Sequence, residues 1–235
     1  MRSSTKMTEE VVRRPRGRPR GFEPDAVLQR VRDVFIEKGF AGASLDELAE
    51  AAGLNRPSLY AAFGDKEQLY IHTLRHYGEH GVAGIDAVFA AKGPIDKRLG
   101  QVFKGAIDLY TAPPYPRGCM IVGTAAVEAP TRPKIAAAAA ELLQATEDAF
   151  ERAFAKAVTA GELAAEPSPE ARARLAGTAL HTLAIRARLG TKPKIVLTGE
   201  CARIARDLGI SRWHVSISHI ETHATASAIG MHGEG

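Results

Sequence analysis

The sequence predicts an all-α protein with a small three-helix domain near its N-terminus and a larger helical bundle after it. From Glu23 to Leu189 apolar residues recur at helical spacing almost without interruption. Pro-rich breaks at 113–116 and 167–169 divide the larger part into segments of helix length. After Leu189 the pattern changes, and we expect residues 190–235 to form an atypical tail of mixed α/β character.

Length and composition set the outer limits. The chain has 235 residues, of which 45% are hydrophobic, so there is material for a real core. No apolar run reaches the roughly 18 residues that suggest a membrane span, and the polar, arginine-rich N-terminus does not resemble a secretory signal. Two cysteines provide no disulfide framework. We therefore expect a cytoplasmic protein.

The positive charge is concentrated at one end of the chain. Residues 1–21 contain seven Lys or Arg and two Glu, a net +5, while the whole chain carries +4. The segment is poor in apolar residues and rich in Pro and Gly, so we expect it to be disordered when free. A basic arm on a neutral body indicates a polyanionic partner, although a solubilising tail would have the same composition.

Residues 22–68 contain the start and stop signals of three short helices. Val27, Val31 and Phe35 share one face of a first helix that we expect to end at Gly39. The run from Ser44 to Glu47 is a capping box for a second helix, which Gly53 ends.

A third helix is predicted from about residue 55 to 62. Asn55 suits its N-cap, and Pro57 falls in the first turn, where the missing N–H costs little. Leu59 and Phe63 should point inward. Asp65 then caps a fourth helix that runs to about residue 90.

Two helices joined to a third by a tight glycine turn form the helix-turn-helix arrangement, which places its last helix in the DNA major groove. Arg56 would stand at the N-terminus of that helix, where a guanidinium can bond guanine O6 and N7. Lys66 places a positive charge in the first turn of the fourth helix, where it is unfavourable because the helix macrodipole is positive at that end. A bound phosphate at the same turn would make the charge favourable. The DNA-contact candidates are Arg18, Arg20, Ser44, Asn55, Arg56, Pro57, Ser58, Tyr60 and Lys66.

Residues 22–77, and above all the stretch SLDELAEAAGLNRPSLYAAFGDKEQLY, resemble the N-terminal domain of the tetracycline-repressor (TetR) family of transcriptional regulators. The resemblance implies a homodimer of all-α subunits that binds a palindromic operator. It also implies a larger C-terminal domain that binds a small ligand and moves the two DNA-binding domains apart. These implications agree with the DNA-contact candidates chosen from the residues themselves.

Residues 69–189 are expected to form the regulatory and dimerisation domain. Helices are predicted at 95–112, 118–128, 131–160 and 168–189. The family's dimer interface suggests that the last of these helices meets a second subunit, or else packs only within its own. Its small and apolar face comprises Leu175, Ala176, Ala179, Leu180, Leu183 and Ala184. The ligand-pocket candidates, which could equally be core residues, are Phe103, Ile107, Tyr110, Cys119, Met120, Val122 and His181.

Cys119 and a row of histidines raise two further questions. Cys119 should begin a helix beside Arg117, and both features lower the pKa of a thiol. The segment RGCMIVGTAAVEA is similar to one in a TetR subgroup with cysteine-based sensors of electrophiles or oxidants, so Cys119 is either a redox sensor or a packed structural thiol. His72, His76 and His80 recur every four residues, but with no further ligand evident we expect a solvated stripe and no metal.

The tail resembles the C-terminal portion of holo-acyl-carrier-protein synthases in the stretches LGISRWHVSISH and ATASAI. That resemblance implies phosphopantetheine transfer from coenzyme A, but the carboxylates that would hold magnesium are missing from the matching pattern. A phosphopantetheinyl transferase fragment or fusion is thus the alternative to a ligand-responsive regulator, and an architectural DNA-binding protein is a third hypothesis. For the regulator we expect no catalytic activity and no cofactor, with operator DNA, a small-molecule effector and a second copy of the chain as partners.

Overall fold

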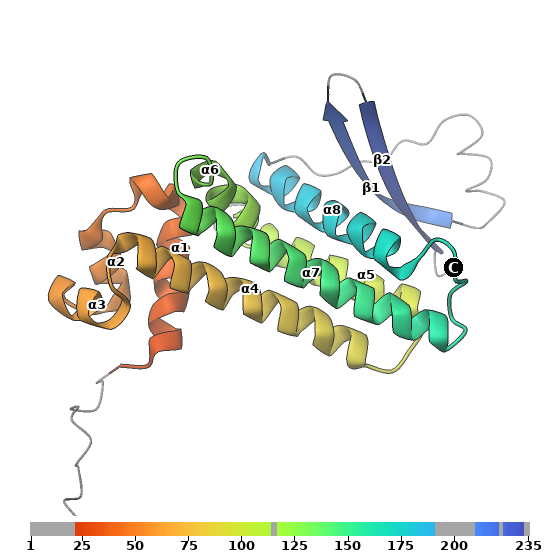
Figure 1. The fold of residues 1–235 in the computed structure, drawn as a ribbon, viewed down its shortest axis with the longest axis horizontal. Coiled ribbons are helices and arrows are strands. Elements are labelled where there is room, and N and C mark those ends of the chain that lie inside the picture. Colours follow the sequence, from red (N-terminus) through yellow and green to blue (C-terminus); the bar gives the residue numbers. More distant parts are fainter. Residues whose placement is uncertain (1–21, 114–116, 191–209, 221–222, 233–235) are drawn as a thin grey trace, which may run out of the picture.

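The computed structural model describes residues 22–113 and 117–190, and the backbone of 210–220 and 223–232 (Figure 1). The predicted arm at 1–21, a predicted strand at 194–197 and a predicted helix up to residue 208 lie outside these ranges. The elements in chain order are α1 (Pro24–Gly42), α2 (Leu45–Ala52), α3 (Arg56–Phe63), α4 (Lys66–Ala90), α5 (Ile95–Tyr110), the π-helix η1 (Ile121–Ala125), α6 (Ala126–Glu128), α7 (Pro133–Thr159), α8 (Pro169–Arg188), β1 (Ile210–Ile220) and β2 (His223–His232).

The predicted all-α architecture is confirmed. Figure 1 shows α1, α2 and α3 gathered at one end of the molecule, while α4 leads from them along the bundle of α5, α7 and α8. In the described part of the chain, no helix is both long and apolar enough to cross a bilayer.

Local chemistry explains the boundaries of the first helices. Ser44 Oγ accepts from the Glu47 amide at 3.3 Å while Glu47 Oε2 accepts from the Ser44 amide at 2.9 Å, so the predicted capping box is present. Gly53 ends α2 in the left-handed region at φ 67°. At Gly39, with φ 70° and ψ 179°, the backbone leaves helical geometry as expected, although one more turn carries α1 to Gly42.

A continuous apolar core joins the three-helix end to the bundle. Tyr70 on α4 is fully buried, and Phe35 and Phe40 of α1 meet its ring edge-on at centroid distances of 4.8 and 5.3 Å. Its hydroxyl lies 2.6 Å from Thr124 Oγ1 of η1. α4 therefore connects the two parts through packing and a buried hydrogen bond.

The prediction of a helix over 118–128 is wrong at its start. Gly118 has φ 65°, and the amides of Arg117 and Gly118 both donate to the Tyr110 carbonyl, so residues 117–119 are not helical. The following turn is the π-helix η1 rather than an α-helix, and Thr124 Oγ1 donates to the Met120 carbonyl at 2.8 Å. Contacts with distant parts of the chain override local helix preference here.

The tail contains an antiparallel pair of strands, β1 and β2, in which Val215 faces Ala228 and Ile217 faces Ala226. The expected strands at 213–218 and 224–231 are thus confirmed and are slightly longer than predicted.

Two glycines on α4 should respond in opposite ways to alanine. A Cβ at Gly84 would meet nothing within 4 Å, so Gly84→Ala should raise the free energy of unfolding by about 0.5–1 kcal/mol through helix propensity. A Cβ at Gly78 would lie 2.5 Å from Leu142 Cδ2, so Gly78→Ala should lower it by about 1–3 kcal/mol through overpacking. Urea denaturation of the two variants measures both. Equal effects would contradict the packing of α4 on α7.

Candidate nucleic-acid interface and internal cavity

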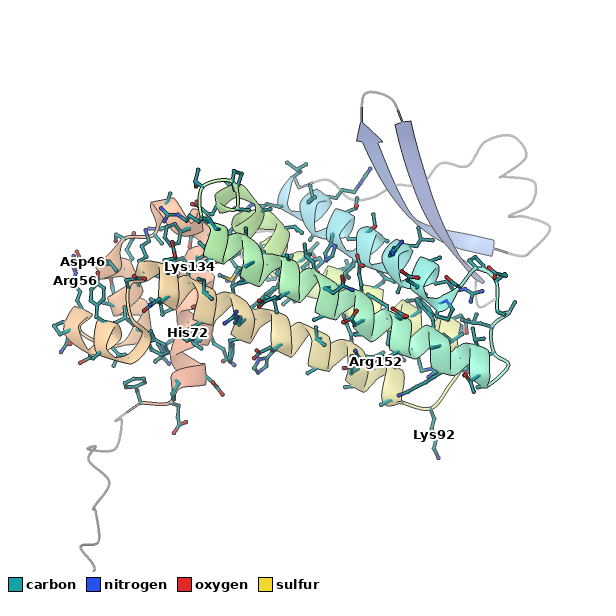
Figure 2. All side chains as sticks on the ribbon, in the orientation of Figure 1. Asp46, Arg56, His72, Lys92, Lys134 and Arg152 are labelled. Atoms are coloured by element: carbon teal, nitrogen blue, oxygen red, sulfur yellow. The ribbon has the colours of Figure 1, made fainter. Side chains whose placement is uncertain are left out.

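The N-terminal turn of α3 is exposed and polar, as the sequence predicted. Asn55 Oδ1 accepts from the Ser58 amide at 2.8 Å, and Pro57 occupies the first turn. Leu59 is buried, whereas Tyr60 keeps 41% of its surface exposed. Asn55, Arg56, Pro57 and Tyr60 are exposed at the start of this helix, and Ser58 is partly exposed. The helix lies at the end of the molecule where α4 begins (Figure 2).

Arg56 has a partner that sequence reasoning missed. Its Nε donates to Asp46 Oδ1 of α2 at 2.6 Å, and a second nitrogen pairs with Oδ2. Both side chains are exposed, and Figure 2 shows them together beside α3. The ion pair spans ten sequence positions and depends on the crossing of two helices, so no local pattern could indicate it.

Ser44 and Lys66 lie near the same end of the molecule as α3, but both side chains already have contacts within the protein. Ser44 is exposed, and its hydroxyl belongs to the capping box with Glu47, whose pKa is lowered to about 2 by hydrogen bonds from Lys38 and then Ser44. Lys66 Nζ turns toward the Ala41 carbonyl at 3.4 Å and lies 4.8 Å from the Phe40 ring centroid. Burial and then the nearby Arg132 lower the pKa of Lys66. Arg18 and Arg20 fall outside the described residues.

A cavity of about 440 Å³ that is partly open to solvent lies between α1, α4, α5 and α8. Of the predicted pocket residues, Tyr110, Cys119 and His181 line it. Phe103 does not line it, because its ring stacks on Phe150 at a centroid distance of 6.4 Å; Met120 is likewise fully buried in the core. Ile107 and Val122 are partly buried against the core but do not line the cavity.

Several lining residues were missed. His76 and His80 were expected in a solvated stripe. His80 is exposed, as expected, but the His76 side chain is only 11% exposed, and both line the cavity. The clearest signal in the sequence was the spacing of Gly78, Gly81 and Gly84, which reduces the side-chain volume on one side of α4. His72 is exposed and does not line the cavity. The described residues contain no group of three or more His, Cys, Asp or Glu side chains that could hold a metal ion.

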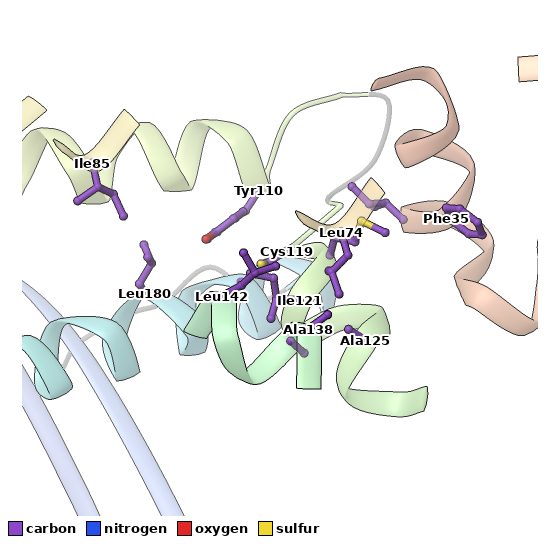
Figure 3. Packing of buried hydrophobic residues seen from close by; sticks show 14 of the residues in the cluster. Phe35, Leu74, Ile85, Tyr110, Cys119, Ile121, Ala125, Ala138, Leu142 and Leu180 are labelled. Carbon is purple, nitrogen blue, oxygen red and sulfur yellow. The ribbon is translucent and has the colours of Figure 1, made fainter. Parts of the chain in front are cut away.

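Cys119 is in a different environment from the one predicted. It is 4% exposed and lies before η1, near Tyr110 and Ile121 in the close-up of the core (Figure 3). Burial raises the pKa of the Cys119 thiol, although hydrogen bonds from Tyr77 and from nearby amides act in the opposite direction. The expected lowering of the Cys119 pKa is therefore wrong, because desolvation is the largest effect on this thiol. Arg117 instead pairs with Asp33 at 3.0 Å.

Alkylation should reveal this burial. In the native protein Cys119 should react with iodoacetamide at least roughly tenfold more slowly than in the urea-unfolded chain, because the thiol is both inaccessible and protonated. Peptide mass spectrometry after timed quenching measures its labelling separately from that of Cys201. Equal native and unfolded rates at Cys119 would contradict its position in the core.

The predicted dimer face of α8 is mostly an internal face. Ala176, Ala179, Leu180, Leu183 and Ala184 are each at most 6% exposed within the single chain, whereas Leu175 remains 39% exposed. α8 packs there on α7 and α5. Apolar periodicity shows which side of a helix is buried, but it cannot tell whether the covering surface belongs to the same subunit.

Comparisons with known proteins identify the family. The family model described as "Bacterial regulatory proteins, tetR family" matches residues 28–73, and that of the "Tetracyclin repressor-like, C-terminal domain" matches 96–197. The structure of the TetR family regulator CifR, complexed with a 26-bp double-stranded operator DNA, is similar at a TM-score of 0.66 and 32% identity. That match covers 74% of this chain and 92% of CifR.

Curated relatives are also transcriptional regulators of the helix-turn-helix type. The regulator YezE of Bacillus subtilis is 29% identical over 64% of this chain and 77% of its own length. The repressor ComR of Escherichia coli K12 is 30% identical over 54% of this chain. This chain spans only 61% of the length of ComR.

The suggested resemblance of residues 190–235 to holo-acyl-carrier-protein synthases is not supported by these comparisons. The second family model runs to residue 197 and so extends into that segment. A short run of strand-like alternation and a few shared letters carried the resemblance, and such patterns recur in unrelated proteins. The chain belongs to the tetR family of bacterial regulatory proteins and is a DNA-binding transcriptional regulator.

Proposed function

We propose that the protein is a repressor that binds a palindromic operator as a homodimer and is released from it by a small molecule. The exposed polar turn at the start of α3 is the observation that supports this proposal most directly. Its N-cap and first-turn residues are held by local hydrogen bonds, so the helix can enter a major groove without refolding.

A second copy of the chain would supply the other half of the operator contact, and α8 has a suitable face. Its exposed side carries Leu175, Thr178, Ile185 and Leu189 at spacings of three, seven and four residues. Ile185 and Leu189 are 48% and 71% exposed. A row of mainly apolar side chains, here interrupted by Thr178, is typical of helices that pair across a two-fold axis.

The cavity is connected to the DNA-binding end by specific contacts. Residues 117–125 include the lining residues Cys119 and Ile121 and hold α1 through the Arg117–Asp33 ion pair. Arg188 Nη1 of α8 donates to the Ile36 carbonyl of α1 at 3.1 Å. A molecule that displaced the cavity wall would therefore act on α1 directly, which supports release by an effector.

Modification of Cys119 is a second trigger for release, since the thiol lines the cavity. Because the thiol is buried and its pKa is raised, we place a bound small molecule first. Cys119→Ser tests the second trigger: a response to an oxidant that persists in this variant rules the thiol out as sensor.

Selection from a random DNA library with the ligand-free protein tests the proposal. We expect a palindromic sequence to be enriched, two chains per duplex by sedimentation velocity, and lower expression of a reporter placed behind that sequence. Failure to enrich any sequence, or a reporter that rises on addition of the protein, would overturn the repressor function.

Lys66→Ala should weaken binding to all DNA sequences by a similar factor and reduce the slope of log affinity against log salt by about 1, because one phosphate contact is lost. Lys66 must first leave Phe40 and the Ala41 carbonyl, which is a short movement for a partly exposed side chain. Lys92→Ala is the control, since this exposed lysine lies beyond the other end of α4 (Figure 2). Fluorescence anisotropy over a salt series measures the slopes, and an unchanged slope for Lys66→Ala would exclude the phosphate contact.

A further inference from the structure

The described residues that line the cavity include basic side chains but no acidic ones. Arg32 of α1 and three histidines, His76, His80 and His181, contribute to the lining. Among the described residues that line it, none is Asp or Glu. A cavity that bound an ammonium compound would be expected to supply a carboxylate, so this composition favours an anionic or acceptor-rich ligand.

Arg32 keeps part of its positive charge available. Its guanidinium bonds Asp33 at 2.9 Å, but the same carboxylate also pairs with Arg117 at 3.0 Å. One negative charge is thus shared between two guanidiniums. Two further acids, Asp25 and Glu79, act on His76 through their charge, but neither lines the cavity, and Asp25 approaches His76 Nε2 only to 3.9 Å.

His76 has an unused nitrogen at the same place. Its Nε2 is buried without a hydrogen-bond partner, and its ring lies against that of His80 at a centroid distance of 4.1 Å. Burial, followed by the charges of His80 and Arg32 among other groups, lowers the pKa of His76. His80 Nδ1 pairs with the His76 carbonyl at 2.8 Å, so its Nε2 remains for another partner. The unpaired His76 Nε2 lowers the stability of the folded protein unless a ligand or water forms a hydrogen bond with it.

The rest of the cavity is apolar and has been left open by glycine. Ile85, Val88, Val102 and Leu180 line this part, and Figure 3 shows Ile85 and Leu180 projecting toward each other from different helices. A Cβ at Gly81, Gly84 or Gly105 would meet nothing within 4 Å. These three glycines are exposed, so their bare backbone widens the open side of the cavity, where an alkyl or aryl group could enter.

We infer that the effector is an apolar organic acid, whose carboxylate lies against Arg32, His76 and His80 and whose body fills the space between α4, α5 and α8. This inference rests on the proposed release by a small molecule and specifies its chemical class. The carboxylate would accept from the guanidinium and from His76 Nε2, which would favour the protonated imidazole. A volume of about 440 Å³ suits a body the size of a medium alkyl chain.

Three probes with one alkyl body and different heads test the inference: decanoate, decanamide and decylamine. Isothermal titration calorimetry on the full chain should show decanoate binding at least roughly tenfold more tightly than decanamide, because of charge-assisted hydrogen bonds. Decylamine, which is cationic at neutral pH, should not bind measurably. Equal affinities, preference for decylamine or failure of decanoate to bind would each overturn the inference.

Two variants locate the binding site. Arg32→Gln should bring the affinity ratio of decanoate to decanamide close to one, whereas Arg75→Gln should leave it unchanged. Arg75 is the matched control because it pairs with Glu141 and does not line the cavity. Gly84→Leu should abolish binding of both probes by filling the apolar part. Unchanged decanoate binding in folded Gly84→Leu protein, or an unchanged ratio in Arg32→Gln, would overturn the inference.

The same samples separate this inference from the proposed function. Ligand-free protein is tested on the selected operator, and decanoate but not decanamide should lower its affinity for that DNA. If the protein binds the operator but no acid binds the protein, only the ligand class is wrong. If the ligand-free protein selects no DNA sequence, the proposed repressor function itself fails.

Discussion

Replacing Arg56 by alanine is expected to weaken binding to the selected operator by about 1–3 kcal/mol, and binding to unrelated DNA by much less. The reason is that Arg56 stands at the exposed N-terminus of α3, where a guanidinium can form two hydrogen bonds to one guanine. In the free protein these donors are held by Asp46. Because both partners are exposed, exchanging the carboxylate for a base edge should cost little.

Fluorescence anisotropy with operator and scrambled duplexes at one fixed salt concentration measures the two losses. Arg152→Ala provides the matched control, since Arg152 forms a similar exposed pair with Asp86 at 2.9 Å on the body of the molecule (Figure 2). That variant should bind both duplexes as the parent does. An equal loss on operator and scrambled DNA for Arg56→Ala would remove Arg56 from base recognition and leave it only a backbone contact.

Replacing Tyr70 by alanine is expected to lower the free energy of unfolding by about 3–5 kcal/mol. Tyr70 is fully buried, two phenylalanine rings of α1 pack edge-on against it, and its hydroxyl bonds Thr124. The substitution would leave a cavity where the three-helix end joins the bundle. Tyr70→Phe, which keeps the ring, should cost only about 1 kcal/mol for the lost hydrogen bond.

Urea denaturation followed by circular dichroism gives these differences. Tyr60→Ala is the matched control: this ring is 41% exposed on α3, so its loss should change stability by no more than about 0.5 kcal/mol. It should weaken DNA binding instead if Tyr60 contacts the operator. A cost below about 1 kcal/mol for Tyr70→Ala would mean that the junction between α1, α4 and η1 is not tightly packed.

The first four helices could be predicted closely because their ends depend on neighbouring residues. Ser44 and Glu47 are three positions apart and cap each other, and Asn55 caps the amide of Ser58. Gly53 ends α2 because a residue without a Cβ enters the left-handed region at little cost. Each of these interactions is completed within one turn of helix, so the order of residues contains all the information that is needed.

The errors occurred where a side chain depends on a distant segment. A start of helix at Cys119 was predicted from local preference, but the Tyr110 carbonyl holds the preceding amides and the thiol lies in the core. His76 was expected in solvent, yet α1 and the cavity wall enclose it. Periodicity correctly found the apolar side of α8 but left open whether a second subunit or the same chain covers it, and in the structure α7 and α5 do.

Capping hydrogen bonds and helical periodicity along the chain were enough to predict the all-α fold and the ends of its first helices, since both act over one or two turns. The motif residues of 22–77 carried the resemblance to the TetR family. The fold alone decided that Arg56 is held by Asp46, that Cys119 is a buried thiol with a raised pKa, and that a cavity with basic groups at one end lies behind α4. Desolvation, ion pairing between helices and the space left by a missing side chain all depend on what the other helices place nearby. These effects depend on distances between residues that are far apart in the sequence, and only the packing of the helices determines those distances.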